Sequence, residues 1–311
     1  MKKVSILIPA YNEEEVLYTL YDRLENVINK LNNYEFEVLL INDGSKDNTL
    51  NILRELRKRD KRMCYINLSR NYGKETAMIA GLDYVTGDCC IILDADLQDP
   101  PELIEEMLKY WEQGYDDVYA KRKSRAGESF MKKFTSSLFY KMLQKSTRIP
   151  IQKNTGDFRL VDRKVIDVIN SLPEHNKFLR GLFSWVGFEQ KAFLYDRPER
   201  KLGTTKYPFK KMFKLASDGI LSFSTKPMKI VGGLGVIAIL FSIAVLIYSL
   251  CSYFGQWNNL TPGWTSIMLC ITFFAGVQLL SLWVLSEYIS RIYDESKGRP
   301  EYIIKEKINI D

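Results

Sequence analysis

Histidine is nearly absent from this chain of 311 residues, which holds only His175. A Ser-His-Asp triad needs an imidazole as its base, and many transition-metal sites use imidazole ligands. The single histidine therefore argues against both kinds of enzyme.

Cysteine is also scarce, and the five residues are Cys64, Cys89, Cys90, Cys251 and Cys270. None of them has the spacing of metal ligands. Cys89 and Cys90 are adjacent in an apolar run, where they are expected to act as small hydrophobic side chains. Reduced thiols in a cytoplasmic setting are therefore expected.

The start of the chain lacks the apolar stretch of a cleavable signal peptide. The run that follows Lys3 extends only from Val4 to Ile8 and is stopped by Pro9. A signal peptide needs an apolar region of about 7–15 residues. We therefore expect no secretory leader.

Positive charge exceeds negative charge only mildly, with 44 Lys and Arg against 38 Asp and Glu and a formal net charge of +6. The basic residues gather in two segments, Lys121, Arg122, Lys123, Arg125, Lys132 and Lys133, and then Arg197, Arg200, Lys201, Lys206, Lys210, Lys211 and Lys214. Such clusters suit nucleic acid, anionic lipid or a phosphorylated substrate. No nucleic-acid recognition motif accompanies them, so we expect no nucleic-acid partner.

The first part of the chain alternates between strand and helix signals. Strands are predicted at 4–8, 36–41, 63–68, up to Asp94 and at 117–120, and helices at 13–31, from a cap at Ser45 or Asp47 to 59, at 74–85 and at 102–113. This order predicts an α/β fold with a mostly parallel sheet and helices on both faces. Polar motifs follow three of the strands, so they predict a site at one sheet edge.

One strand ends in two carboxylates spaced one residue apart, Asp94 and Asp96. In an extended segment both side chains point to the same side. They repel each other unless a cation lies between them, and Mg²⁺ or Mn²⁺ prefers such oxygen ligands. The pattern predicts a metal that neutralises a diphosphate, and an acidic turn is the alternative.

Two long C-terminal segments, 230–254 and 265–286, contain no charged residue. Each is long enough to cross a ~30 Å hydrocarbon core as a helix. They predict a transmembrane hairpin in the cell membrane, with a buried hairpin of a soluble protein as the alternative. Basic residues before and after the hairpin predict that the large N-terminal domain and both termini are cytoplasmic.

Lysine and aromatic residues interleave between Thr204 and Lys226, with apolar residues at roughly helical spacing. An amphipathic helix at the cytoplasmic interface fits this pattern, and an ordinary surface helix is the alternative. The predicted organisation is a catalytic domain over 1–203, interface helices over 204–228, two transmembrane helices over 229–290 and a cytoplasmic tail over 291–311.

Three motifs in order on successive strands resemble the signature of glycosyltransferase family 2. They are Leu7-Ile8-Pro9-Ala10-Tyr11-Asn12-Glu13, Asn42-Asp43-Gly44-Ser45-Lys46-Asp47-Asn48-Thr49 and Asp94-Ala95-Asp96-Leu97-Gln98-Asp99-Pro100-Pro101-Glu102. Within the family, the chain is similar to the polyprenyl-phosphate glycosyltransferases, namely dolichol-phosphate mannose synthase and, because of the two-span tail, the bactoprenol glucosyltransferase type. The resemblance extends over essentially the whole chain. It implies a GT-A domain, a nucleotide-sugar donor and Mg²⁺ or Mn²⁺.

The resemblance assigns the nucleoside pocket to the first two motifs. Pro9, Tyr11 and Glu13 would line this pocket, and Asp43 would hydrogen-bond the base. A strand-end carboxylate that caps its own turn is the alternative for Asp43.

The third motif would bind the metal and the diphosphate. The resemblance places Asp94 at the ribose or the metal, and Asp96 and Gln98 on the metal. Lys74 follows Gly73 at a predicted helix start, where it is either a cation near the phosphates or an exposed helix lysine.

Asp157 lies in Thr155-Gly156-Asp157, where the family carries an acidic acceptor-side motif. The resemblance places it near the reacting sugar, either as a base or as a group that orients hydroxyls. A phosphate monoester has a second pKa of about 6 and hardly needs deprotonation, so orientation is favoured.

The two basic segments are expected to hold the acceptor phosphate. The candidates are Arg122, Lys132 or Lys133 with Ser136 or Ser137, and Arg200 with Lys206. Arg122, Lys133, Ser137, Arg200 and Lys206 are the predicted set, and Arg122 and Arg200 are favoured within it. A patch that contacts lipid headgroups is the alternative.

The expected reaction is the inverting transfer of a single hexose from a UDP-sugar to undecaprenyl phosphate, by direct attack of the lipid phosphate. One alternative is a processive polysaccharide synthase, which normally carries a Gln-x-x-Arg-Trp segment and more spans; this chain shows neither. Another is a non-catalytic, membrane-anchored sugar-nucleotide-binding protein, against which Asp94, Asp96 and Asp157 argue. The sugar, the choice of UDP or GDP and homo-oligomer formation are left open.

Overall fold

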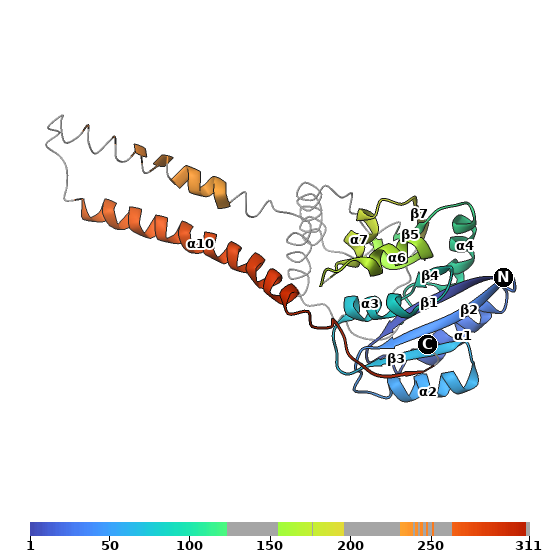
Figure 1. Ribbon diagram of the computed structural model, residues 1–311. Coiled ribbons are helices and arrows are strands. Elements are labelled where there is room, and N and C mark those ends of the chain that lie inside the picture. Colours follow the sequence, from blue (N-terminus) through green and yellow to red (C-terminus); the bar gives the residue numbers. More distant parts are fainter. Residues whose placement is uncertain are drawn as a thin grey trace. The chain divides into compact units, whose positions relative to one another are not determined.

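The computed structural model describes residues 1–122, 155–175, 177–195, 231–238, single positions between 240 and 251, and 263–308. The chain forms two units, one of Met1–Gly219 with Pro300–Asp311 and one of Ile220–Arg299. The first unit holds an eight-stranded sheet, and the second holds the long helix α10 (Trp264–Ser296) (Figure 1).

The sheet has the strand order β7-β5-β6-β4-β1-β2-β3-β8. The strands are β1 (Lys2–Ala10), β2 (Tyr34–Asn42), β3 (Met63–Leu68), β4 (Cys89–Ile92), β5 (Asp117–Arg122), β6 (Thr155–Asp162), β7 (Gln190–Tyr195) and β8 (Ile304–Ile308). Strand β1 is parallel to β2 and β4, β2 to β3, and β5 to β7. Strand β6 runs antiparallel to β4 and β5, and β8 to β3. An α/β fold with a mostly parallel sheet is thus confirmed.

Helices alternate with the strands along the chain. They are α1 (Leu17–Ile28), α2 (Thr49–Arg59), α3 (Lys74–Tyr84), the short η1 (Pro101–Leu103), α4 (Ile104–Glu112), α6 (Arg163–Ser171) and α7 (Leu179–Trp185). Helix α3 packs closely on β1, because a Cβ atom at Gly81 would come within 2.0 Å of Leu7 Cδ1. The sheet core is formed by the apolar residues of β1, β2 and β4, which are almost fully buried.

Helix α1 begins at Leu17, later than the predicted position 13. The preceding segment is instead tied to the loop after β2, since the backbone N–H groups of Asn12 and Glu13 donate to the side chains of Ser45 and Thr49. Ser45, one of the two predicted caps, does not cap α2, which begins at Thr49. The N-cap position of α2 is Asn48, and Asp47 Oδ1 accepts from Thr49 N at 3.1 Å.

The C-terminal strand β8 closes the far edge of the sheet, although residues 291–311 were expected to be a tail. Glu306 of β8 lies 2.6 Å from Arg54 Nη2 of α2 and accepts from Tyr65 Oη of β3 at 2.6 Å. Ser69 N donates to Ile303 O at 2.8 Å. The chain therefore returns to the sheet after α10.

The second unit contains α10 and a helical stretch at 231–238. The rings of Phe241 and Phe273 lie 6.0 Å apart between centroids, so Phe241 packs against α10. In the described part of the chain one helical segment, Phe273–Ser296, is long and apolar enough to cross a membrane. A hairpin of two spans is not confirmed, and the predicted interface helices over 204–228 lie outside the described residues.

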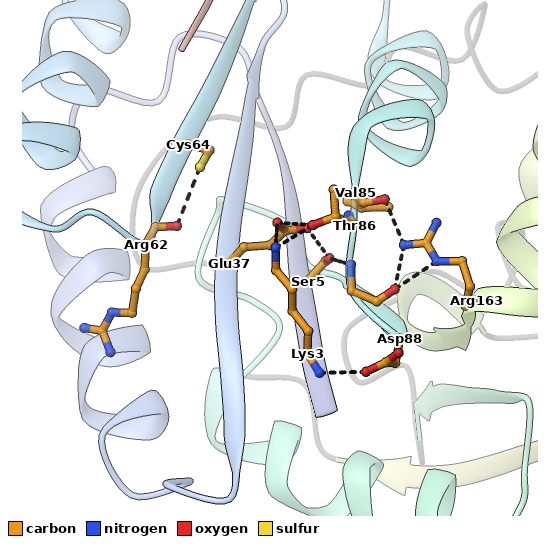
Figure 2. A network of polar contacts seen from close by, with 10 residues as sticks. Lys3, Ser5, Glu37, Arg62, Cys64, Val85, Thr86, Asp88 and Arg163 are labelled. Atoms are coloured by element: carbon orange, nitrogen blue, oxygen red, sulfur yellow. Dashed lines mark hydrogen bonds and ion pairs between the residues drawn. The ribbon is translucent and has the colours of Figure 1, made fainter. Parts of the chain in front are cut away.

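A polar network fixes the edge of the sheet where β1 and β4 begin (Figure 2). Glu37 of β2 accepts from Ser5 Oγ and from Thr86 N, the latter at 2.7 Å, and its Oε2 lies 2.9 Å from Lys3 Nζ. Ser5 Oγ also accepts from Gly87 N at 2.8 Å. A Cβ atom at Gly87 would lie 2.6 Å from Ser5 N, so the loop fits only with glycine.

We predict that Glu37→Gln lowers the free energy of unfolding at pH 7 by about 1–3 kcal/mol, the range for a lost charge-assisted hydrogen bond. Burial raises the pKa of Glu37, but the bonds from Lys3, Ser5 and Thr86 outweigh it and hold this pKa below its usual value. The carboxylate therefore stabilises the fold above the ordinary Glu pKa of about 4.3, and this contribution is lost as the pH falls through the lower folded pKa.

Denaturant unfolding at pH 7 and at pH 3 measures this effect, and the gap between wild type and Glu37→Gln should shrink at pH 3. Glu35→Gln is the matched control, since Glu35 lies on the same strand and is exposed. It should stay within about 0.5 kcal/mol of wild type. An equal loss in both variants would contradict the prediction.

Candidate active site

The candidate site lies where the strand order of the sheet reverses. Strand β1 has β2 on one side and β4 on the other, and ligands of open α/β sheets bind at the carboxyl ends of such strands. Tyr11, Asp43 and Asp94 all follow these strand ends. Strand β6 runs antiparallel and pairs Arg159 with Ile92, so two residues further along this register Asp157 lies opposite Asp94.

The side chain of Lys74 joins these two carboxylates. Its Nζ lies 2.5 Å from Asp94 Oδ1 and 2.5 Å from Asp157 Oδ2. Burial lowers the pKa of Lys74, but the charges of Asp157 and Asp94 outweigh burial and raise this pKa above its usual value. Lys74 therefore lies at the sheet edge between two carboxylates, and its role near the phosphates stays a prediction.

Asp157 binds a second cation, Arg180 of α7. Arg180 Nε donates to Asp157 Oδ1 at 2.6 Å, and the Asp157 side chain is only 6% exposed. Burial raises the pKa of Asp157, but the charges of Arg180 and Lys74 and their hydrogen bonds outweigh it and hold this pKa well below its usual range. A carboxylate with so low a pKa is a poor proton acceptor at neutral pH.

A third carboxyl group, Glu75, lies next to this cluster. Burial, followed by the charge of Asp157, raises its pKa to about 7, although Arg180 and Lys74 oppose the rise. Leu179 N donates to Glu75 Oε2 at 3.4 Å. Sequence patterns missed both Glu75 and Arg180, because neither follows a strand and only the packing of α3 and α7 brings them to Asp157.

Asp43 controls the loop that leads into Lys74. Its carboxylate accepts from Tyr72 N at 2.7 Å, Gly73 N at 2.9 Å and Asn71 Nδ2 at 2.9 Å. Burial raises the pKa of Asp43, against the two backbone bonds. A carboxylate has about four acceptor positions, so these bonds leave room for one more. Asp43 thus holds the neighbouring loop rather than its own turn, and its contact with a base stays a prediction.

Glycine is required at two positions of this region. Gly44 has a φ of +63°, and a Cβ atom there would lie 2.3 Å from the carbonyl carbon of Arg70. Gly73 has a φ of +101° directly before α3. Both backbone conformations are costly for other residues.

The loop after β1 is tied to the loop after β2. Asn12 N donates to Ser45 Oγ at 2.9 Å, and Lys46 N donates back to Asn12 Oδ1 at 2.9 Å. Asn12 has a φ of 54°, a conformation that asparagine tolerates. The loop that carries Tyr11 and Glu13 is thereby fixed beside Asp43, while Pro9 pairs with Ile41 within the sheet.

The loop after β4 holds Asp96 and Gln98 in a tight turn. Asp96 Oδ1 accepts from Gln98 N at 3.2 Å, and the intervening Leu97 has a φ of 61°. Leu97 packs against the core, and buried Asp99 accepts from Tyr195 Oη at 2.7 Å. The acidic-turn alternative therefore describes the local geometry, and it is compatible with metal binding.

The donor chemistry of this loop fits a hard divalent cation. Carboxylate oxygens of Asp94 and Asp96 and an amide oxygen of Gln98 are the ligands that Mg²⁺ or Mn²⁺ takes. Asp94 Oδ1 is buried and receives no aligned hydrogen bond in the described structure, although it contacts Lys74. No group of three or more His, Cys, Asp or Glu residues could hold a metal among the described residues. Phosphate and water oxygens would therefore have to complete the coordination.

The predicted acceptor residues are almost entirely outside the described part. Lys133, Ser137, Arg200 and Lys206 lie outside the described residues, as do Lys132 and Ser136. Arg122 is the last residue of β5, and only its backbone is described. Their roles stay predictions.

Comparison with known proteins gives consistent matches. The model of "Glycosyl transferase family 2" matches residues 5–169. An uncharacterized glycosyltransferase, YkcC, of Bacillus subtilis is 47% identical over 99% of this chain and 94% of its own length. A bactoprenol glucosyl transferase of Shigella phage SfV is 41% identical over 97% of this chain and 98% of its own. A solved structure of glucosyl-3-phosphoglycerate synthase from Mycobacterium tuberculosis is 15% identical, with a TM-score of 0.49 over 71% of this chain and 76% of that one.

We predict that Lys74→Met lowers the free energy of unfolding at pH 7 by about 1–3 kcal/mol, because two carboxylates lose their shared cation. The Lys74 side chain is 30% exposed, so solvent screens part of its attraction to the two carboxylates. Because the folded pKa of Lys74 is raised, its contribution is fully present at pH 7. Because the folded pKa of Asp157 is lowered, the contribution is lost as the pH falls below about 3.9 and through that lower value.

Denaturant unfolding between pH 7 and pH 2 measures this loss. Lys109→Met is the control, since Lys109 is exposed and its ion pair among the described residues is with Glu105 on its own helix, at 2.7 Å. That pair should be worth at most about 0.5 kcal/mol. Equal stability of Lys74→Met and wild type at pH 7 would contradict the prediction.

Proposed function

The chain belongs to glycosyltransferase family 2, and from this premise we propose that it transfers a single hexose from a UDP-sugar to a polyprenyl phosphate. The observation that carries the proposal is the convergence at one sheet edge of the loop that follows Asp94, the loop that holds Tyr11 and Glu13, and Asp157. Lys74 joins Asp94 to Asp157. The acceptor class is supported by the bactoprenol glucosyl transferase that matches over nearly the full length of both chains.

The donor would lie along the carboxyl ends of β1, β2 and β4. Tyr11 and Glu13 would contact the nucleoside together with Pro9, and Asp43 would use its remaining acceptor position on the base. Asp94, Asp96 and Gln98 would hold Mg²⁺ or Mn²⁺, which supplies positive charge for the departing nucleoside diphosphate when it is bound. Lys74 would add a fixed positive charge beside it.

The sugar would be attacked directly by the lipid phosphate with inversion at the anomeric carbon. Asp157 would orient a sugar hydroxyl by accepting a hydrogen bond from it, with no proton transfer. Its low pKa supports this role over that of a base. The acceptor needs no strong base, because a phosphate monoester is already anionic near pH 7.

The acceptor would reach the site from the cytoplasmic leaflet of the cell membrane. The apolar helix in α10 supports membrane attachment, and we extend it to a two-span hairpin over 229–290 with interface helices over 204–228. Both termini would then be cytoplasmic. The acceptor phosphate would be bound by a basic and hydroxyl set of residues, Arg122, Lys133, Ser137, Arg200 and Lys206.

The donor assay tests this function directly. Purified full-length protein in detergent, given undecaprenyl phosphate and a panel of labelled UDP- and GDP-sugars, should form a lipid-linked monosaccharide from one UDP-hexose. EDTA should abolish transfer, and Mg²⁺ or Mn²⁺ should restore it. The Asp96→Ala substitution should lower kcat at least about 100-fold, and the variant should keep its fold. Absence of transfer with every sugar and metal would refute the function.

The acceptor site is tested by Arg200→Ala. Loss of one charge-assisted bond of about 1.5–3 kcal/mol should raise the KM for undecaprenyl phosphate about 10- to 100-fold and leave the donor KM within about twofold. Lys201→Ala, its neighbour in the chain, should change neither value beyond about twofold. A larger change in the donor KM would move Arg200 to the donor side.

A further inference from the structure

Arg180 is an unassigned residue that contacts a buried carboxylate of the site, Asp157. It is the second residue of α7, and its Nε lies 2.6 Å from Asp157 Oδ1. The other oxygen, Asp157 Oδ2, faces Lys74 at 2.5 Å. Each oxygen of the carboxylate therefore has its own cation. Lys74 also contacts Asp94, at 2.5 Å.

A second contact sets the position of α7 on β6. The guanidinium of Arg159 lies over the ring of Phe183, 4.3 Å from its centroid. Asp157 and Arg159 are two residues apart on a strand, so they share one face. Arg180 and Phe183 are three residues apart on a helix, so they too are neighbours on one face. Two matched contacts therefore align the helix with the strand.

Buried polar groups in turn hold this second contact. Arg159 Nη1 donates to Asp117 Oδ2 at 3.1 Å, with side-chain exposures of 5% and 1%. Gln190 Nε2 donates both to Asp117 Oδ2 at 3.0 Å and to Phe183 O at 2.7 Å. Strands β5, β6 and β7 thus fix α7, and with it the backbone from which Arg180 extends.

We propose that Arg180 is a positioning residue for sugar transfer, which acts through Asp157 by fixing one carboxylate oxygen while Lys74 fixes the other. This inference rests on the proposed function. Each oxygen has a second acceptor position, so the fixed carboxylate still accepts a hydrogen bond from a sugar hydroxyl. Loss of Arg180 lets the carboxylate rotate about the Lys74 contact, which misplaces that hydroxyl in the transition state.

The test compares Arg180→Gln and Arg180→Lys with wild type in the transfer assay. Arg180→Gln should lower kcat about 10- to 100-fold and leave the donor KM within about twofold, as expected for an interaction that matters in the transition state. Arg180→Lys keeps the charge and should recover part of the loss. Ser184→Ala on the same helix is the control and should keep wild-type kcat, because Ser184 bonds only to the Arg180 carbonyl in the described contacts.

A double-mutant cycle separates positioning from a general structural role. In an Asp157→Asn background, Arg180→Gln should lower kcat by less than about twofold further, because its target is already altered. A full additional loss in that background, or wild-type kcat in Arg180→Gln, would overturn the proposal. If Arg180→Gln does not fold, the same cycle is run with Arg180→Lys and decided by the same criterion.

The outcome is distinguishable from failure of the proposed function. If wild type transfers no sugar, the function fails on its own assay. The contact is then decided by the same cycle on denaturant unfolding, in which Arg180 and Asp157 should be non-additive. Additive effects on unfolding would overturn the contact, and with it the positioning role, whatever the transfer result.

Discussion

The position of one ammonium group, Lys74 Nζ, between Asp94 and Asp157 organises this site. Two carboxylates at one sheet edge repel each other strongly in a partly buried setting, so the edge is stable only with a cation between them. Lys74 is placed there by the loop that Asp43 holds through Tyr72 and Gly73. The loop that Asp43 holds, the loop that follows Asp94, and Asp157 are therefore linked through a single residue.

A second, buried ion pair, Asp117 with Arg159, lies farther from the site and has incomplete hydrogen bonding. Asp117 Oδ1 and Arg159 Nε are buried and have no hydrogen-bond partner in the described structure. Burial raises the pKa of Asp117 to about 6, although Arg159 lowers it. Such a pair contributes little net stability because both charges lose their hydration. Its consequence is directional, since it holds Phe183, and so α7, in one orientation on β6.

A site residue could be predicted from the sequence only where a local pattern, such as the end of an apolar strand, indicated its position. Asp43 and Asp94 directly follow apolar strands, so periodicity alone predicted their convergence. The approach of Asp157 to Asp94 depends on the antiparallel register of β6, which no local pattern encodes. Arg180 lies on a helix face with no distinguishing spacing. Strand β8 has three consecutive charged residues, Lys305, Glu306 and Lys307, between two isoleucines, so no period-2 pattern marked it as a strand and residues 291–311 were predicted to be a tail.

The charges of the cluster fit an anionic nucleophile. Asp94 and Asp157 carry negative charge toward the site, while Lys74 and Arg180 supply two positive charges that offset it. Burial and the charge of Asp157 raise the pKa of Glu75 to about 7, so this group is partly protonated at neutral pH and adds little negative charge. Under the proposed function, a phosphate that approaches Asp157 would meet a nearly balanced field rather than bare carboxylates. Such a balance, rather than a strong base, would suit the proposed direct attack by a phosphate oxygen.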